Sequence, residues 1–198
     1  RNQVWAELSH EGLGFPSLMV YRQDKQRPAQ HEEQELQQLN GVRMQPANRW
    51  RPDVPPIVQH GDFRFALLVC SELTNISYRA ALRGNVDALF VPEWNQDTET
   101  FNALVESAAL DMHAYIVQCN DRQYGDSRIR APFKESWKRD VLRVKGGVTD
   151  YCVIGEIDVK ALRQFQSSYR SPGTTFKPVP DGFEIAHSRK LLPKGDAA

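Results

Sequence analysis

The chain has 198 residues, of which 40% are hydrophobic and 25% charged, as expected for one globular domain. Its 25 basic and 25 acidic residues cancel, so net charge gives no general attraction to nucleic acid or to an anionic membrane. No apolar run approaches the roughly 18 residues of a membrane span, so we expect no transmembrane segment. The chain does not open with a basic stretch followed by an apolar one, so we expect no signal peptide. The three cysteines, Cys70, Cys119 and Cys152, lack paired spacing, which indicates a reducing, cytoplasmic compartment.

Sequence periodicity in the first part of the chain predicts two strands and one helix. A strand is expected over 15–24, and a helix over 26–40 that ends at Gly41. The proline-rich stretch 44–62 is expected to be a loop. The run 63–70 predicts a strand that is apolar enough to be buried on both faces.

The remainder of the chain alternates helical and extended patterns. Helices are expected over 77–85, 97–113 and 159–166, and strands over 86–94, 114–120, 127–130 and 151–159. Residues 171–198 are expected to form an extended C-terminal tail, which leaves 1–170 as the domain. This order predicts an α/β layered domain with a substantially parallel sheet.

Ligands of such folds bind at the carboxyl ends of the strands, and Cys70 lies at one of these ends. The stretches 92–95 and 118–120 lie at two others. A nucleophilic cysteine needs a base, a nearby cation or a helix N-terminus to form its thiolate, and a helix is expected shortly after Cys70. The alternative is a structural role, because free cysteine is among the most frequently buried residue types.

Four stretches in this order resemble the carbon–nitrogen hydrolase (nitrilase) superfamily. The first, LMVYRQDKQRPAQHEEQEL, is similar to the segment that carries the family's lysine, and LLVCSELTNISYRAALRGNVDALFVPEWN to the one that carries its cysteine. FNALVESAALDMHAYIVQCNDRQYGDSRIRAP and VIGEIDVKALRQFQ resemble the later helix–strand and strand–helix segments. The resemblance covers roughly residues 15–166 and implies an α-β-β-α sandwich.

The resemblance also implies a reaction and a set of residues. Cys70 would attack an amide or nitrile carbon, and Lys25 and the backbone N–H of Ser71 would stabilise the oxyanion. Glu32 or Glu33 would match a second glutamate that orients the lysine. The implied chemistry needs neither a metal nor an organic cofactor. Three further residues are candidates for the substrate pocket, with structural roles as the alternative: Glu72, Trp94 and Asn95.

The family's triad glutamate lies well upstream of its lysine. Only Glu7 and Glu11 precede Lys25 here, and both are too close to it. We therefore expect the N-terminal portion of the family's fold to be missing from this chain. Either the chain is part of a larger, multidomain protein, or the domain has degenerated.

Two other readings of the sequence concern partners. A catalytically silent, nitrilase-like scaffold could mediate homo-oligomerisation or hold a partner, since members of the family resemble one another in forming dimers and larger assemblies. Nucleic acid is a weaker candidate partner, because eight basic residues lie between Asp121 and Gly147 with three aromatic residues interleaved. Four acids offset half of that basic charge, and the scattered histidines lack the spacing of a zinc site.

Overall fold

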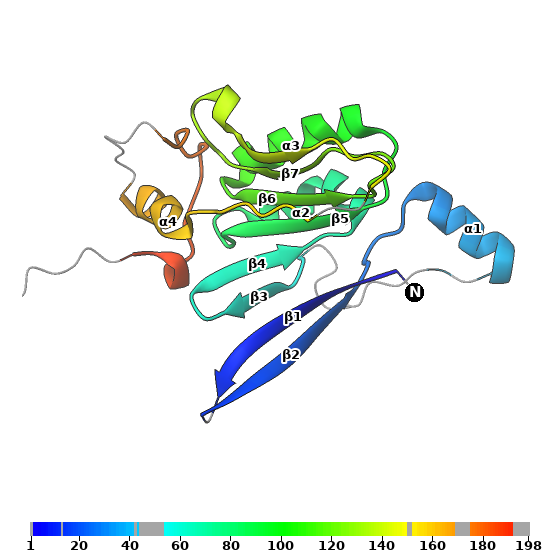
Figure 1. Cartoon of the computed structure of the whole chain (residues 1–198), viewed down its shortest axis with the longest axis horizontal. Helices are drawn as coiled ribbons and strands as arrows, with labels where there is room; N and C mark the ends of the chain where they lie inside the picture. The colour runs from blue at the N-terminus through cyan, green and yellow to red at the C-terminus, as the bar shows by residue number, and fades with distance from the viewer. Residues whose placement is uncertain are drawn as a thin grey trace, which may run out of the picture.

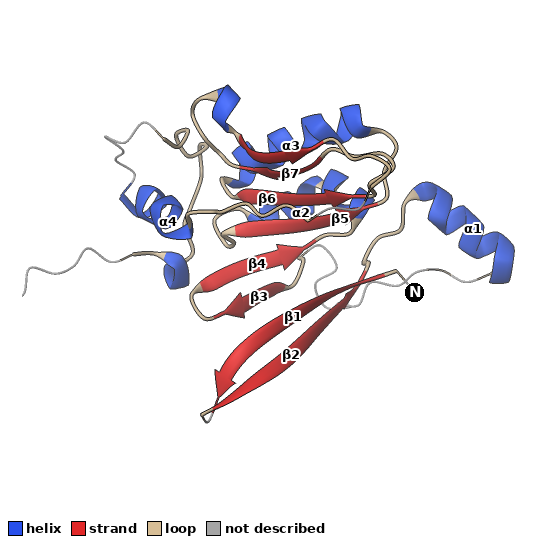
Figure 2. Cartoon of the chain, viewed as in Figure 1, coloured by secondary structure: helices blue, strands red, loops and turns tan. Residues whose placement is uncertain are grey.

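A mixed six-stranded sheet forms the centre of the computed structural model, which describes residues 2–12, 14–41, 43, 54–149, 152–168 and 175–191 (Figures 1 and 2). Its strands lie side by side in chain order: β3 (Ile57–His60), β4 (Phe63–Leu67), β5 (Ala88–Glu93), β6 (Tyr115–Asn120), β7 (Ser127–Arg130) and β8 (Asp140–Val144). The central strands β4, β5 and β6 are parallel, and the remaining neighbours pair antiparallel. The carboxyl ends of the three parallel strands therefore meet at one edge.

Helices α2 (Ile76–Leu82) and α3 (Thr98–Met112) cover one face of this sheet. Side chains alternate along a strand, so Leu89 and Val91 of β5 point to this face, as does Ile116 of β6. They pack against apolar residues of the two helices in the largest core cluster. Helix α4 (Val159–Ser168) packs through Leu162 in a second apolar cluster, which contains Ala88 and Tyr115 at the amino ends of β5 and β6.

The opposite face of the sheet contacts a separate two-stranded hairpin, formed by β1 (Gln3–Gly12) and β2 (Phe15–Asp24). Leu8 of β1 packs against Phe65 and Leu67 of β4. The hairpin runs into α1 (Gln30–Asn40), and Figure 1 shows this junction on the side to which the parallel strands point. The hairpin thereby brings Lys25, just after β2, to the carboxyl edge of the sheet.

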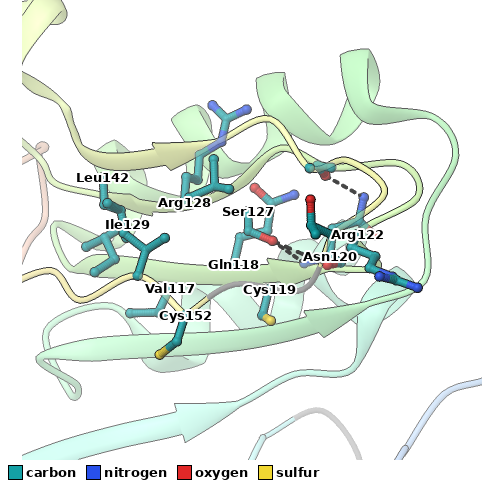
Figure 3. Close-up of a pocket in the computed structure, with 15 residues that line it drawn as sticks. Val117, Gln118, Cys119, Asn120, Arg122, Ser127, Arg128, Ile129, Leu142 and Cys152 are labelled. Carbon is teal, nitrogen blue, oxygen red and sulfur yellow. Dashed lines mark hydrogen bonds between the residues drawn. The ribbon is translucent and has the colours of Figure 1, made fainter.

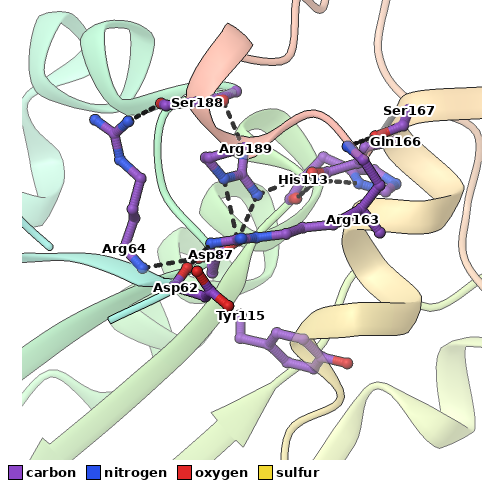
Figure 4. Close-up of polar contacts among 12 residues, drawn as sticks. Asp62, Arg64, Asp87, His113, Tyr115, Arg163, Gln166, Ser167, Ser188 and Arg189 are labelled. Carbon is purple, nitrogen blue, oxygen red and sulfur yellow. Dashed lines mark hydrogen bonds and ion pairs between the residues drawn. The ribbon is translucent and has the colours of Figure 1, made fainter. Parts of the chain in front are cut away.

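Asp87, directly before β5, fastens two distant segments to the domain (Figure 4). Its buried carboxylate accepts hydrogen bonds from Arg163 of α4 (Nε, 2.8 Å) and from Arg189 (Nη2, 2.8 Å). Burial by itself would raise the pKa of Asp87, but the two guanidinium groups outweigh it and lower that pKa. Within the segment 175–191, Phe176 and Phe183 are also buried.

Several predicted elements are confirmed. The structure has strands within 15–24, 63–70, 86–94, 114–120 and 127–130, and helices within 26–40, 77–85, 97–113 and 159–166, to within one or two residues at most ends. The α/β class is confirmed as well. The parallel arrangement holds for the three central strands only.

Four differences have physical reasons. Strand β1 was not predicted: its inward side chains Val4, Ala6 and Leu8 alternate with exposed ones, but the exposed Trp5 is itself apolar and obscures the pattern in the sequence. Strand β3 lies at the end of the expected loop 44–62, of which 44–53 lie outside the described residues. Strand β8 lies in a charged segment and carries a half-buried aspartate, Asp140, and an exposed arginine, Arg143. The strand expected over 151–159 is wrong for 152–158, which cross the sheet face instead of pairing, with Gly155 against Ile129.

Candidate active site

Cys70 lies in a sharp turn at the carboxyl end of β4. The N–H of Leu68 still donates to the carbonyl of Phe90 on β5 (3.0 Å), and a 3-10 helix, Cys70–Thr74, begins two residues later. The φ angle of Cys70 is 52°, in the left-handed region that costs a residue with a side chain about 1–2 kcal/mol. Residues held in such conformations cluster at functional sites. The turn presents the half-buried thiol at the edge where the parallel strands end.

The surroundings of the thiol act on its pKa in both directions. Burial raises the pKa of Cys70, and the negative charge of Glu93 adds to this effect. Hydrogen bonds from the backbone N–H groups of Trp94 and Ser71 and the positive charge of Lys25 lower it, but they do not outweigh burial. The thiol is therefore largely protonated at neutral pH, and the helix that follows it does not supply a thiolate in advance.

Lys25 is 1% exposed, and its ammonium group forms an ion pair with Glu32 of α1 (Nζ–Oε2, 2.5 Å). Glu32 also accepts hydrogen bonds from the backbone N–H of Ala29 (2.6 Å) and the side chain of Asn2 (3.1 Å). Burial alone would raise the pKa of Glu32, but these donors and the charge of Lys25 lower it. Within the described part of the chain, no hydrogen bond or ion pair joins Glu33 to Lys25.

Glu72 connects the turn of Cys70 to the segment that follows Lys25. Its carboxylate is 2% exposed and accepts hydrogen bonds from the backbone N–H groups of Val69 (2.8 Å), Arg27 (2.9 Å) and Gln26. Burial raises the pKa of Glu72 in spite of these donors. Because one side chain holds both loops, the ammonium group of Lys25 lies close enough to act on the thiol of Cys70.

Trp94 and Asn95 follow the last residue of β5. The indole of Trp94 is 62% exposed and meets the ring of Tyr124 edge to face, with 5.7 Å between the centroids. Asn95 donates its backbone N–H to the side chain of Asn120 (2.9 Å), which donates in return to the carbonyl of Asn95 (2.9 Å). The indole of Trp94 thus forms an exposed aromatic surface with Tyr124, while its backbone N–H meets the thiol, and Asn95 fixes the strand end to β6.

Two buried polar residues, Glu93 near the thiol and Gln118 in contact with Glu93, were not among the predicted site residues. Glu93, the last residue of β5, accepts a hydrogen bond from Gln118 of β6 (Nε2–Oε2, 2.9 Å). Burial raises the pKa of Glu93 to about 7, although the hydrogen bond from Gln118 and the charge of Arg128 oppose that rise. A charged residue at the end of an otherwise apolar strand was the signal that could have identified Glu93.

A cavity lies beside Gln118 and does not include Cys70 in its lining (Figure 3). It has a volume of about 440 Å³ and is lined by β6, β7, β8 and the segment that follows β8. Figure 3 shows Cys119 and Cys152 on its wall, whereas Cys70 does not line it. Gln118 and Arg128 border both this cavity and the surroundings of Glu93.

The basic run between Asp121 and Gly147 is largely neutralised by acids of the same surface. Five of its eight basic side chains form ion pairs: Arg128, Arg130, Lys138, Arg139 and Arg143. Their acidic partners come from α3, β8 and the adjoining loops. Paired arginines attract phosphate less than free ones do, so this surface does not favour a nucleic-acid partner.

In the described ranges, no group of three or more histidine, cysteine or carboxylate side chains is placed to hold a metal ion. None of the helices in the described part of the chain is both long and apolar enough to cross a bilayer.

Comparison with known proteins gives structural matches alone. No protein-family profile and no curated protein sequence matches this chain. The fold is similar to that of XC1258 from Xanthomonas campestris, a CN-hydrolase superfamily protein, with a TM-score of 0.54, 13% identity, and coverage of 77% of this chain and 57% of that one. It is also similar to Nit3 from Saccharomyces cerevisiae, a member of branch 10 of the nitrilase superfamily, with a TM-score of 0.50, 15% identity, and coverage of 73% and 51%.

Both matched structures are members of one superfamily, and this chain spans about half the length of each. In this chain, the strand-to-turn junction of Cys70 and the loop of Lys25 lie close together. The described fold is therefore that of the nitrilase, or CN-hydrolase, superfamily, of which this chain spans a part.

Proposed function

We propose that this chain carries the nucleophile and the oxyanion site of a carbon–nitrogen hydrolase that acts on a small amide or nitrile. The observation that supports this proposal most directly is the proximity of the Lys25 ammonium group to the Cys70 thiol. Glu72 joins their two loops through backbone hydrogen bonds, and the ammonium charge acts on the thiol. A buried lysine beside a cysteine in a left-handed turn is an arrangement suited to acyl transfer.

In the proposed reaction, the sulfur of Cys70 attacks the carbonyl carbon of the amide as its proton leaves. Lys25 stabilises the tetrahedral oxyanion, and the backbone N–H of Ser71 is the second donor. The amine leaves with a proton, and water then hydrolyses the thioester to release the acid. The ion pair with Glu32 holds the ammonium group of Lys25 in place, since its partner is fixed at the start of α1. Trp94 offers an apolar wall for the acyl group of the substrate.

The test is hydrolysis of a panel of short aliphatic and aromatic amides and nitriles, measured by the release of ammonia. Cys70→Ala is expected to abolish turnover, and Lys25→Ala to reduce kcat at least about 10²-fold, as removal of an oxyanion donor does in acyl-transfer enzymes. Cys119→Ala, at an exposed thiol, is the matched control and is expected to leave turnover unchanged.

Lys25→Ala leaves the carboxylate of Glu32 without its ion pair, which destabilises the variant. Urea unfolding is therefore measured for each variant to show that it remains folded. Folded Cys70 and Lys25 variants that keep the wild-type rate would refute the proposal. A wild-type protein that hydrolyses none of these compounds, with an unreactive Cys70, would instead favour the catalytically silent scaffold.

A further inference from the structure

A cysteine that is protonated at rest needs a group to take its proton when it attacks. Burial raises the pKa of Cys70, so its surroundings do not supply a standing thiolate. The proton acceptor must be a carboxylate or imidazole within reach of the sulfur, directly or through one water molecule. Among the described side chains, three buried or half-buried carboxylates lie near Cys70 and Lys25: Glu32, Glu72 and Glu93.

Two of these carboxylates are already occupied. The two oxygens of Glu72 accept three backbone hydrogen bonds, which hold the loops of Cys70 and Lys25 together. Glu32 forms an ion pair with Lys25, and its other oxygen accepts from Asn2. Proton uptake by either group would weaken the contacts that build the site.

Glu93 is placed differently. It ends β5 immediately before Trp94, whose backbone N–H donates to the thiol, and its negative charge acts on Cys70. It shares the face of Leu89 and Val91, so it lies on the helix-covered side of the sheet. Its side chain is 8% exposed, so the carboxylate is withdrawn from bulk water.

One carboxylate oxygen of Glu93 is left without a partner. Oε2 accepts the hydrogen bond from Gln118, whereas Oε1 is buried and has no donor among the described residues. The side-chain oxygen of Gln118 is likewise buried and unpaired in the described part of the chain. Buried acceptors are rarely left unpaired, so such a pair points to a donor that arrives with the substrate or with the reacting thiol.

We propose that Glu93 is the proton acceptor of Cys70. This assignment rests on the proposed function. In the first step, the S–H bond breaks, the proton binds Oε1 of Glu93, and the sulfur forms its bond to the carbonyl carbon. When the C–N bond breaks, Glu93 returns that proton to the leaving amine. In the second step, Glu93 takes a proton from the attacking water, and the thiol recovers it when the C–S bond breaks.

The polar and charged groups around Glu93 and Cys70 favour the proton transfer in this cycle. Arg128 of β7 faces Glu93 and favours its carboxylate form, and Gln118 of β6 hydrogen-bonds the oxygen that does not take the proton. The positive charge of Lys25 favours the thiolate that the transfer creates. Burial raises the pKa of Glu93 to about 7, close to the operating pH at which a general base is most effective.

Glu93→Gln is the variant that tests the assignment, because the amide keeps the shape of the side chain and its acceptor toward Gln118. Two rates are measured from pH 5 to 9: kcat/KM for the best amide, and the rate of alkylation of Cys70 by limiting iodoacetamide, with the modified cysteine identified by mass. The assignment predicts that turnover falls by 10²-fold or more. It predicts that alkylation at pH 7 is faster, because a negative charge beside the thiolate has been removed.

These opposite directions distinguish a proton acceptor from a structural residue, whose loss would lower both rates together. Glu93→Asp, which keeps a shorter carboxylate, is expected to recover part of the turnover. Wild-type turnover in Glu93→Gln would overturn the assignment. If the wild-type protein hydrolyses none of the amides, the proposed function fails, and the alkylation rates then decide the assignment on their own. An identical pH profile in both proteins would overturn it, and a shift of the midpoint to lower pH in Glu93→Gln would support it.

Discussion

The burial of Glu93 has a consequence for stability that can be measured without any substrate. Its pKa is raised from 4.5 to about 7, so the folded state binds its proton more tightly than the unfolded chain does. The resulting stability is fully present below pH 4.5 and is lost as the pH rises through 7. At 1.36 kcal/mol for each pKa unit, this loss is about 3 kcal/mol, most of it between pH 5 and 8. Glu93→Gln has no proton to lose there and should not show this loss.

The assay is urea unfolding of the wild-type protein and of Glu93→Gln at pH 5, 6, 7 and 8. We expect the stability of the variant relative to wild type to increase by about 2–3 kcal/mol across this range. Glu184→Gln, at an exposed position, corrects for the effect of pH on the measurement itself.

A constant difference between Glu93→Gln and wild type at all four pH values would refute the reasoning, because it would mean that Glu93 ionises at the same pH in the folded and unfolded states. A difference that shrinks as the pH rises would reverse the sign and show that the surroundings stabilise the carboxylate. Either result would also remove the electrostatic support for Glu93 as a base.

Two further predictions concern the contacts that hold the segment 175–191 to the domain. Asp87→Asn leaves two guanidinium groups without their carboxylate, so we expect a loss of about 3–5 kcal/mol at pH 7 in urea unfolding. Because the pKa of Asp87 is lowered in the folded state, this difference should diminish as the pH falls below its ordinary value of 3.8; an unchanged difference at pH 3 would contradict the ion-pair explanation. Gly84→Ala places a Cβ 1.9 Å from the carbonyl oxygen of Glu184, and should cost at least about 2 kcal/mol and speed proteolysis of the segment. Gly182→Ala has the same φ of +71° with nothing within 4 Å, so an equal loss in both variants would refute the role of the close contact.

Local patterns predicted those parts of the fold in which burial follows the sequence period. The apolar run before Cys70 predicts a strand buried on both faces, and β4 is such a strand between β3 and β5. The regular apolar spacing over 97–113 likewise predicts α3. Strands β1 and β8 show the apolar period less clearly in the sequence, because the exposed Trp5 of β1 is apolar and β8, at an edge of the central sheet, carries charged side chains.

The candidate site was predicted in part, from resemblance to a family and not from the periodicity that predicted the fold. The positions of Lys25 and Cys70 came from resemblance to a family, and their catalytic roles stay predictions. The choice between Glu32 and Glu33 depended on which side chain of α1 turns toward Lys25, and the ion pair at 2.5 Å is made by Glu32. The resemblance could not indicate Glu93, because its interest depends on burial and on an unpaired oxygen.

The sequence by itself determined the order of the helices and of the central strands, the end of a buried strand at a thiol, and the resemblance to a superfamily whose fold is similar to that of the described residues. Only the tertiary structure decided which charges meet. Asp87 pairs with Arg189, 102 residues away, and Glu72 holds the loop after Lys25 from 45 residues away. The physical reason is that periodicity in a sequence reports the burial of each residue among its neighbours in the chain, whereas contacts between distant charges depend on the order and direction of the strands that carry them.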